Sequence, residues 1–312
     1  MEVAEIPESA ESFLVVRLGA IGDCLRVLPA LRRLRLERPR ARIGWVVEHW
    51  VHPVLAGHPD VDRFHVLDRR ALQGGPVGAC AEALRLKREL GRDGYEVALD
   101  FHGRFKSGVV SRLSAAPWRV GFARGDSTEG NHLFTNVHVR LDDRWKSRVL
   151  RFLDLLGPLG IDTGFDSADL GVHVNGDRLK EARDWYRRLG SPPLVAYPGT
   201  SLVRSDERWP AGRWKQLLAS LARDGVGSVV LWGPDEEDFA RDIAQGAGRP
   251  CRLAPATSLP EMMAMLSLFT VYVGADTAAM HMAWMQGVAT AVFTGPKPLR
   301  TIAPLGAAPW RA

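Results

Sequence analysis

The stretch FLVVRLGAIGD, residues 13–23, shows how the chain begins to fold. Its first part, residues 13–18, is a largely apolar run rich in residues that favour strands, which predicts a buried β-strand. Glycines then form a turn, and apolar residues recur every three positions between Asp23 and Leu36 until Pro39 ends the pattern. The order of strand, glycine-rich turn and helix predicts the first unit of an α/β fold.

The same alternation of strand and helix continues along the chain. In the first half we expect further strands at 42–47, 62–67 and 95–100, and helices at 79–90, 106–113 and 145–159. In the second half we expect helices at 178–189, 209–223, 234–246, 260–268 and 277–287, and strands at 194–197, 229–232, 271–273 and 290–293. This pattern is typical of mostly parallel sheets with helices on both faces.

The length of 312 residues suits two α/β domains of about 150 residues each, because single cores tend to stop growing near that size. Residues 160–175 have the glycine, aspartate and serine content of a connector. We therefore expect a first domain at 1–165 and a second at 166–312. The chain stops at Ala312, soon after the last expected strand, so we expect the second domain to lack the final helix that normally packs against such a lobe.

The composition is that of an ordinary globular protein, with 46% hydrophobic and 25% charged residues. No segment has the roughly 20 apolar residues that would span a bilayer. The first dozen residues are acidic and lack the pattern of a secretory signal, so we expect a cytoplasmic protein. The cysteines, Cys24, Cys80 and Cys251, are far apart without metal-ligand spacing, and we interpret them as small buried residues and expect no metal site.

A good part of the net charge of +5 comes from a basic run at residues 32–42. Leucines interleave with its arginines, which favours the solvated face of a helix. An anionic membrane surface or an acidic substrate is the alternative partner for such a run. No helix-turn-helix, zinc-finger or RNP signature accompanies it, so we expect no nucleic-acid partner.

Polar residues that follow strands are the candidates for chemistry, because ligands of doubly wound sheets bind outside the carboxyl ends of the strands. Asp23 follows the first strand and stands at the start of a helix. The turn before it lacks the G-x-G-x-x-G spacing of dinucleotide sites, and its carboxylate would repel a phosphate. Asp23 is therefore either a general base or an N-cap aspartate, and its position alone leaves both interpretations open.

Three later loops also follow expected strands. YPGTS, residues 197–201, with Arg204 and Arg208 after it, is either a cradle for a diphosphate or a polar turn with surface arginines. GADTAAMH, residues 274–281, is either a ligand site or a helix cap followed by a core histidine. FHGRFK, residues 101–106, either offers cations to an acidic acceptor or only begins a helix.

Four groups of residues follow one another along most of the chain. They are RLGAIGD (17–23) with LPAL (28–31), Asp100 with Lys106-Ser107, Trp209-Pro210 with Trp214 and Leu217, and Gly274-x-Asp276-Thr277-x-x-x-His281. As an ordered set they resemble the ADP-heptose:lipopolysaccharide heptosyltransferase family, glycosyltransferase family 9. The resemblance implies a GT-B fold, in which two Rossmann-like α/β domains with mostly parallel sheets face a central cleft. The first domain would bind mainly the acceptor and the second mainly the sugar nucleotide.

The resemblance also implies roles for single residues. Asp23 is similar to the family's catalytic base. The implied contacts to the sugar nucleotide are Gly22, Thr200, Ser201, Arg208, Glu236, Asp276, Thr277 and His281. We expect Arg63, Arg104 and Lys106 to contact the acceptor.

Two positions depart from the family pattern. The lysine that usually stands two residues before the Trp-Pro pair is Glu207 here, which leaves the phosphate contact to the adjacent Arg208 or to Arg204. The glycine that usually follows Asp-Thr is Ala278, which fits a helical turn but not a bend with positive φ.

The resemblance therefore implies an inverting glycosyltransferase that moves a heptose from an ADP-activated donor to inner-core lipopolysaccharide or a similar anionic glycolipid. The ADP-sugar is a co-substrate, and we expect no cofactor and no metal. We expect peripheral contact with the inner membrane face, where the acceptor resides. The alternatives are a sugar-nucleotide epimerase of the same architecture and a non-catalytic sugar-nucleotide-binding protein.

Overall fold

The structure, a computed structural model, describes residues 6–166, 170–190, 192–200, 208–293, 301 and 305, except for the side chain of Leu72. The chain divides into two compact units, with the division between His173 and Val174. This point lies in the expected connector, a few residues after the expected boundary at 165/166. Each unit is described by itself below.

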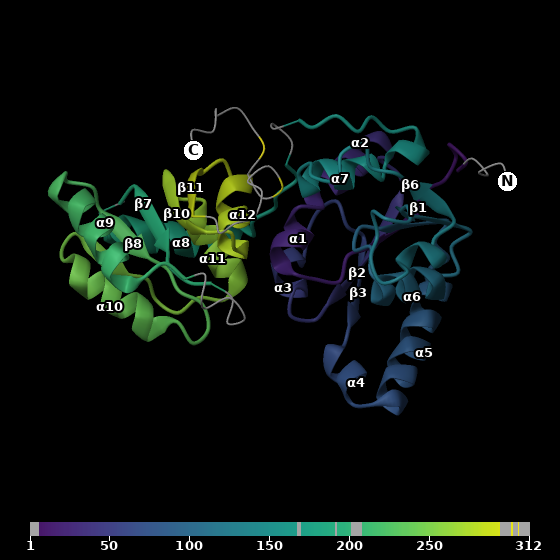
Figure 1. Ribbon diagram of the computed structural model, residues 1–312, viewed down its shortest axis with the longest axis horizontal. Coiled ribbons are helices and arrows are strands. Elements are labelled where there is room, and N and C mark those ends of the chain that lie inside the picture. The colour runs from purple at the N-terminus through teal and green to yellow at the C-terminus, as the bar shows by residue number, and fades with distance from the viewer. Residues whose placement is uncertain are drawn as a thin grey trace. The chain divides into compact units, whose positions relative to one another are not determined.

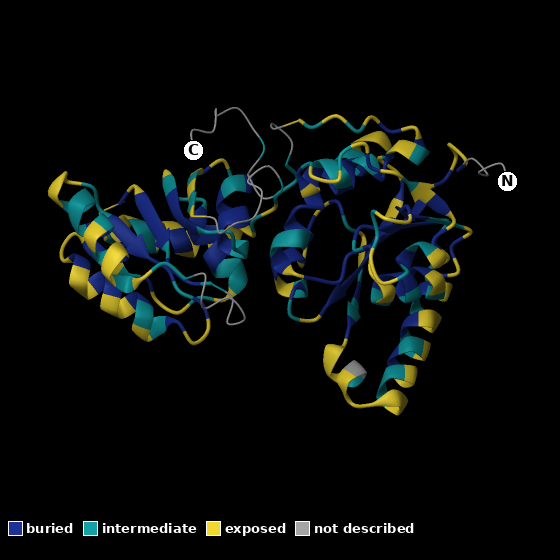
Figure 2. Ribbon diagram, in the orientation of Figure 1, coloured by how far each residue is buried: buried dark blue, intermediate teal, exposed yellow. Residues whose placement is uncertain are grey.

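The first unit contains a six-stranded sheet in the order β3-β2-β1-β4-β5-β6, and all of its strand pairs are parallel (Figure 1). The three central strands are almost completely buried, as expected for apolar runs covered on both faces (Figure 2). The strands are β1 (Ser12–Val16), β2 (Arg42–Glu48), β3 (Arg63–Leu67), β4 (Val97–Asp100), β5 (Trp118–Phe122) and β6 (Val137–Val139).

The helices of the first unit include one departure from expectation. The single helix expected from Asp23 to Leu36 is two helices, because Pro29 lacks the N–H group and the ring space that an unbroken helix would need. The helices are α1 (Ile21–Leu25), α2 (Leu28–Glu37), α3 (His52–Leu55), α4 (Arg69–Gln73), α5 (Pro76–Asp93), α6 (Phe105–Leu113) and α7 (Arg148–Asp154), with 3-10 turns η1 (Asn131–Leu133) and η2 (Gly157–Leu159).

The second unit repeats the architecture with a five-stranded parallel sheet in the order β11-β10-β7-β8-β9. Its strands are β7 (Leu194–Tyr197), β8 (Ser228–Val230), β9 (Cys251–Leu253), β10 (Val271–Ala275) and β11 (Ala289–Phe293). Its helices are α8 (Gly176–Arg188), α9 (Ala211–Arg223), α10 (Glu237–Ala247), α11 (Leu259–Leu266) and α12 (Ala278–Met285). Two parallel α/β units confirm the predicted fold class.

The sequence did not predict β5, β6 and β9. β6 and β9 are three-residue strands at the edges of their sheets, where half-exposed positions need no apolar run. β5 has the sequence WRVGF, whose arginine and glycine interrupt the apolar pattern. None of the helices in the described ranges is long and apolar enough to cross a membrane.

Close packing in the first unit depends on a glycine in β2. Gly44 pairs with Leu14 of β1, and the ring of the buried Tyr95 lies directly against it. A Cβ atom at residue 44 would lie 2.0 Å from the Tyr95 hydroxyl oxygen, which itself lies 2.8 Å from His65 Nε2. No side chain fits at this position unless the Tyr95 and His65 pair moves.

We expect Gly44→Ala to lower the free energy of unfolding by about 1–3 kcal/mol, because the added methyl group overpacks the Tyr95 ring. Urea denaturation followed by tryptophan fluorescence measures the change. Gly91→Ala is the matched control, since a Cβ there in α5 meets no atom within 4 Å, and it should leave stability equal or slightly higher. Equal stability of the two variants would contradict this account of the packing.

Candidate active site

A cavity of about 630 Å³ opens at the carboxyl ends of the strands of the first unit. Residues at or after the ends of β1 to β5 form its wall, because parallel strands all end at the same edge of a sheet. Six cationic side chains face four carboxylates there. The cations are Arg17, Arg69, Arg104, Lys106, Arg148 and Arg151, and the carboxylates are Asp23, Glu48, Asp126 and Glu129. The excess of positive charge suits an anionic ligand.

Asp23 lies in the wall of this cavity, inside α1. The N-cap residue of α1 is Ala20, so the N-cap interpretation of Asp23 is wrong. Three arginines bind the Asp23 carboxylate: Arg17, Arg26 at 2.8 Å and Arg148 at 2.5 Å. Its neighbour Gly22 does not line the cavity, whose backbone wall comes from Gly19 and Ala20.

The three arginines decide the protonation state of Asp23. Burial by itself raises the pKa of the carboxyl group, but the charges of Arg17, Arg148 and Arg26 outweigh burial and hold the pKa well below its ordinary value. Asp23 is therefore an anion throughout the neutral range. It is also a weak base for as long as all three arginines remain bound to it.

The three arginines differ in how firmly they are held. The side chains of Arg17 and Arg26 are each 8% exposed, whereas that of Arg148 is 48% exposed. Arg17 also donates to the carbonyl oxygen of Phe101 at 3.0 Å and lies over the ring of Phe152. Arg148 is thus the partner that a ligand in the cavity reaches most easily.

Two of the three expected acceptor contacts lie in the cavity and one does not. Arg104 and Lys106 line it, and Lys106 Nζ lies 2.6 Å from Glu48 Oε1. Arg63 is the first residue of β3, at the opposite end of the strand, and pairs with Asp93 at 2.9 Å. The prediction that Arg63 lies beside Arg104 in the acceptor site is therefore wrong. The residue that follows the carboxyl end of β3 and lines the cavity is Arg69.

A buried carboxylate holds the loop after β4. Asp100 is fully buried and accepts hydrogen bonds from the backbone N–H groups of His102 and Gly103, at 2.9 and 3.0 Å. The Ser107 hydroxyl and the Asn131 amide also donate to it, at 2.9 and 2.7 Å. Burial raises the pKa of Asp100 above its ordinary value despite these bonds. The motif that joins Asp100 to Lys106-Ser107 is thus a support for the cavity wall.

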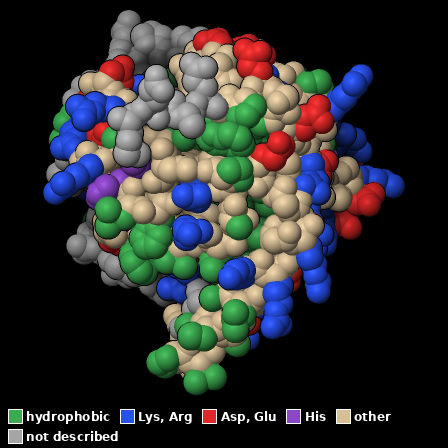
Figure 3. Space-filling model, turned by 90° about the vertical axis from the view of Figure 1, so that its right-hand side faces the viewer, with side chains coloured by type: hydrophobic (Ala, Val, Ile, Leu, Met, Phe, Trp, Pro, Cys, Tyr) green, Lys and Arg blue, Asp and Glu red, His purple; other side chains and the backbone are tan. Residues whose placement is uncertain are grey.

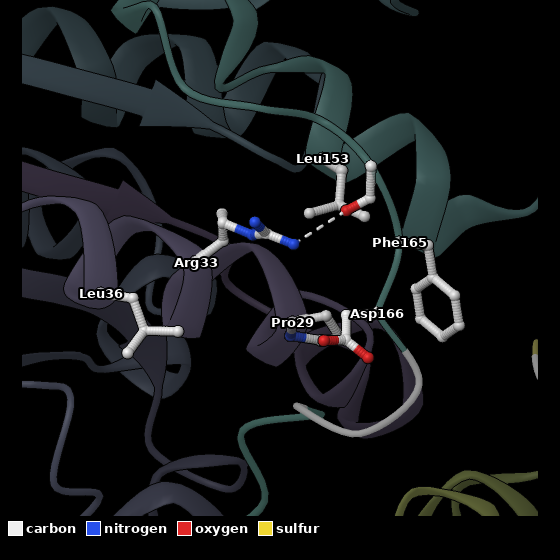
Figure 4. Close-up of a pocket in the computed structure, with 7 residues that line it drawn as sticks. Pro29, Arg33, Leu36, Leu153, Phe165 and Asp166 are labelled. Atoms are coloured by element: carbon white, nitrogen blue, oxygen red, sulfur yellow. Dashed lines mark hydrogen bonds between the residues drawn. The ribbon is translucent and has the colours of Figure 1, made fainter.

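A second, smaller pocket of about 90 Å³ lies between α2, α7 and residues 164–166 (Figure 4). Arg33 reaches across it and donates to the carbonyl oxygen of Gly164 at 3.2 Å. Asp23 does not line this smaller pocket, and the volume of the pocket is too small for a sugar nucleotide. The Arg33 contact shows that this arginine of the basic run binds the protein's own chain.

In the second unit, Glu236 is the centre of a buried polar cluster. Its carboxylate accepts hydrogen bonds from the backbone N–H of Thr200 at 3.0 Å and of Gly233 at 3.1 Å. The Tyr197 hydroxyl and Arg208 donate to it at 3.2 and 3.0 Å. Four donors use the acceptor sites of a carboxylate, and the residue is 4% exposed. Glu236 therefore holds the turn at Thr200 and the side chain of Arg208 in place. It can reach Thr200 because β7 and β8, which precede the two residues, are neighbours in the sheet.

The Asp-Thr…His motif lies at the end of the neighbouring strand β10. Thr277 is the N-cap residue of α12, and His281 is buried within the helix with its Nε2 atom 3.5 Å from Asp276 Oδ1. Gly274 pairs with Tyr197 of β7, so this motif and the Glu236 cluster lie on adjacent strands. Ser201 and Arg204 lie outside the described residues. In the described ranges, no group of three or more His, Cys, Asp or Glu side chains is placed to hold a metal ion.

Sequence reasoning missed the residues that control Asp23. Arg17 stands within the first strand motif but reads as part of an apolar run, and Arg148 is far away in sequence on α7. The signal that the sequence offers is a charged residue, Arg17, at the end of an apolar run.

The model of a family described as glycosyltransferase family 9 (heptosyltransferase) matches residues 83–308, which is most of the chain. The chain belongs to this family. It is therefore a glycosyltransferase, as the motifs predicted.

Curated relatives match the sequence of this chain over most of their length. Lipopolysaccharide heptosyltransferase 1 of Salmonella typhimurium is 26% identical over 278 residues, which are 86% of this chain and 83% of the relative. The lipopolysaccharide core heptosyltransferase OpsX of Haemophilus influenzae is 21% identical over 301 residues, which are 94% of this chain and 82% of the relative.

Solved structures of the family share the fold. A glycosyl transferase of family 9 from Veillonella parvula superposes with a TM-score of 0.81 at 20% identity, over 96% of this chain and 85% of that one. Escherichia coli heptosyltransferase WaaC with ADP gives 0.78 at 24% identity, over 94% and 90%. These similarities confirm the GT-B fold class.

We expect His102→Gln to reduce the loss of stability of this protein in acid. Burial, together with Arg17 and Arg104, lowers the pKa of His102 to about 3, against an ordinary value of 6.5. The unfolded chain binds this proton more readily, so the stabilisation is fully present above pH 6.5 and is lost as the pH falls toward 3. Melting temperatures measured between pH 4.5 and 8 give the slope of stability against pH for each variant. His138→Gln, at an exposed histidine, is the control, and equal slopes for both variants would contradict the prediction.

We expect Glu236→Ala to cost about 3 kcal/mol of stability, because it leaves Arg208 and buried backbone donors without their acceptor. Urea denaturation measures the change in the free energy of unfolding. Glu237→Ala removes the side chain of the next residue, a glutamate that is 46% exposed and paired with Arg241, and should change stability by less than about 0.5 kcal/mol. Similar losses of stability in both variants would contradict the proposed role of Glu236 as the acceptor for this cluster.

Proposed function

We propose that this chain transfers a heptose from an ADP-activated donor to an anionic inner-core lipopolysaccharide acceptor, with inversion at the anomeric carbon. The observation that carries the proposal is the Asp23 carboxylate in the wall of a cation-rich cavity. Curated relatives are lipopolysaccharide heptosyltransferases, and WaaC has been solved with ADP and with ADP-2-deoxy-2-fluoro heptose. These names support the choice of donor and acceptor.

The proposed reaction is a single displacement. An acceptor hydroxyl oxygen attacks the anomeric carbon of the heptose while the bond from that carbon to the diphosphate oxygen breaks. The hydroxyl proton passes to Asp23, and ADP leaves with the bonding electron pair. Attack from the face opposite the leaving group inverts the configuration.

The arginines around Asp23 give the acceptor a part in activating the base. An anionic group of the acceptor competes for Arg148, the most exposed of the three partners. Withdrawal of that cation would raise the pKa of Asp23 and free one acceptor position on its Oδ1 atom, which Arg26 also binds, for the acceptor hydroxyl. The base would then gain strength when the acceptor is bound. Arg104, Lys106 and Arg69 would hold the remaining negative charge.

The donor side belongs to the second unit in this proposal. Arg208 and the N-terminus of α12 at Thr277 would offset the charge on the departing diphosphate. Thr200, Asp276 and His281 would contact the nucleotide, with Ser201 and Gly22 as further proposed contacts. Glu236 would act on the nucleotide through the turn at Thr200. The ADP-sugar is the co-substrate, and we propose that neither a cofactor nor a metal takes part.

We further propose that the protein works in the cytoplasm, at the inner membrane face, where its glycolipid acceptor would be found. The curated lipopolysaccharide heptosyltransferases support this placement through the acceptor that their names state.

We expect Asp23→Asn to lower kcat for transfer from ADP-heptose by about 10²–10⁴-fold, because the amide cannot accept the hydroxyl proton. Affinity for ADP should remain within about twofold, since the side chain of Asp23 is not among the proposed donor contacts. Release of ADP with a lipid A precursor as acceptor, in buffer with EDTA, measures turnover. Asp142→Asn, at an exposed aspartate outside the cavity, is the matched control. Near-normal turnover of Asp23→Asn would show that the base is another group.

Incubation with UDP-GlcNAc alone and titration with ADP, beside the transfer assay, separate the alternative functions. An epimerase would convert UDP-GlcNAc without any acceptor. A non-catalytic binding protein would bind ADP but would not turn over with any glycolipid. Loss of the wild-type activity in EDTA would contradict the proposal that no metal takes part.

A further inference from the structure

Helices α4 and α5 form a projection from the first unit, which we call the α4–α5 projection and define as residues 69–93 (Figure 1). Most of its residues from 73 to 81 are exposed (Figure 2). Gly78 of α5 packs closely on α4, since a Cβ atom there would lie 2.4 Å from the carbonyl oxygen of Ala71. The two helices therefore form one packed element with an exposed tip.

One face of α5 is apolar and exposed. Residues 78, 82, 86 and 90 are spaced four apart and point inward, where Glu82, Leu86 and Leu90 are buried. On the exposed side, Val77 is 84% exposed and Leu84 is 53% exposed. Ala81 lies between them at helical spacing and is also exposed. A helix that only covered the sheet would not need large apolar residues on this side.

The exposed charges of the projection are basic between residues 69 and 88. Arg69, Arg70, Lys87 and Arg88 are exposed. The acid Glu82 is buried and paired with Arg85. In Figure 3, hydrophobic side chains gather at the end that projects downward, and Lys and Arg side chains lie above them on the same face. An apolar tip with a basic margin matches the charge and polarity of an anionic membrane surface.

The projection is continuous with the proposed acceptor site. Arg69, the first residue of α4, lines the cavity that holds Asp23. The tip is thus joined to the cavity wall by one short helix.

We propose that the α4–α5 projection docks the chain on an anionic lipid bilayer, with Val77 and Leu84 in the interface and Lys87 and Arg88 against the headgroups. The inference rests on the proposed function, since it explains how a cavity that takes a glycolipid headgroup reaches its acceptor. Val77, Ala81 and Leu84 repeat at helical spacing along one exposed side of α5, so this side can lie in the interface plane as the apolar face of an interfacial helix does. Lys87 and Arg88 follow Leu84 within about one turn.

Sedimentation of the full chain with lipid vesicles tests the docking surface. Vesicles of phosphatidylethanolamine with phosphatidylglycerol should bind the chain, and vesicles of phosphatidylcholine should bind it at least about tenfold more weakly. The double variant Val77→Gln, Leu84→Gln should lose at least about tenfold in binding to the anionic vesicles. Leu36→Gln is the matched control, because Leu36 is 51% exposed on α2, and it should bind like the wild type.

The basic margin is tested in the same way. Lys87→Gln with Arg88→Gln should weaken binding by about fivefold for each residue, and the loss should shrink in high salt. Arg213→Gln with Arg223→Gln makes the same charge change on exposed residues of α9 and should leave binding unchanged. Equal effects of the two double variants would show that net charge alone, and not the projection, binds the lipid.

Further readouts separate failure of the inference from failure of the proposed function. The projection variants should transfer to a delipidated, water-soluble acceptor at the wild-type rate, and their melting temperatures should be unchanged. Transfer without any vesicle binding by the wild type would overturn the docking inference and leave the proposed function standing. Vesicle binding without transfer to either acceptor would support docking and contradict the function. Self-association that the Val77 and Leu84 changes abolish would show that a second copy of the chain covers this face.

Discussion

All strand pairs in the described parts of both sheets are parallel, and this constraint decides where the chemistry of the chain lies. A parallel strand needs a crossover before the next one, so every loop that follows a strand gathers at the same edge. In the first unit this edge brings Asp23, Glu48 and His102 into one cavity from three strands. In the second unit it brings the turn at Thr200 beside Glu236.

Buried carboxylates surrounded by donors are the second common feature of the two units. Asp23 among its arginines and Glu236 among its four donors are both mostly withdrawn from water, which is unfavourable for an unpartnered charge. Each carboxylate has at least one partner that is distant in sequence, Arg148 for Asp23 and Thr200 for Glu236, so each joins separate segments of the chain. The weak basicity of Asp23 is the chemical consequence of the same arrangement.

The family match and the cavity support one another. The family model covers most of the chain and identifies a glycosyltransferase, while the structure shows which side chains its motifs bring together. Asp100 illustrates the difference between a motif and a role, since it is buried and supports the loop before Arg104 and the first turn of α6, which carries Lys106. The α4–α5 projection belongs to no motif, and its exposed apolar residues are evident only when the burial of each helix face is known.

The sequence by itself determined the α/β class, most strands and helices, and the candidate loops, because apolar periodicity and glycine turns are local properties of the chain. It also determined the family, through an ordered set of motifs. Only the tertiary structure decided the state of Asp23, since Arg148 reaches it from 125 residues away. The tertiary structure also showed that Arg69, and not Arg63, lines the cavity. This depended on the bounds and direction of β3 in the sheet, which decide at which end of the strand each residue lies. Contacts between distant loops leave no periodic trace in the sequence, whereas buried strands and helices do.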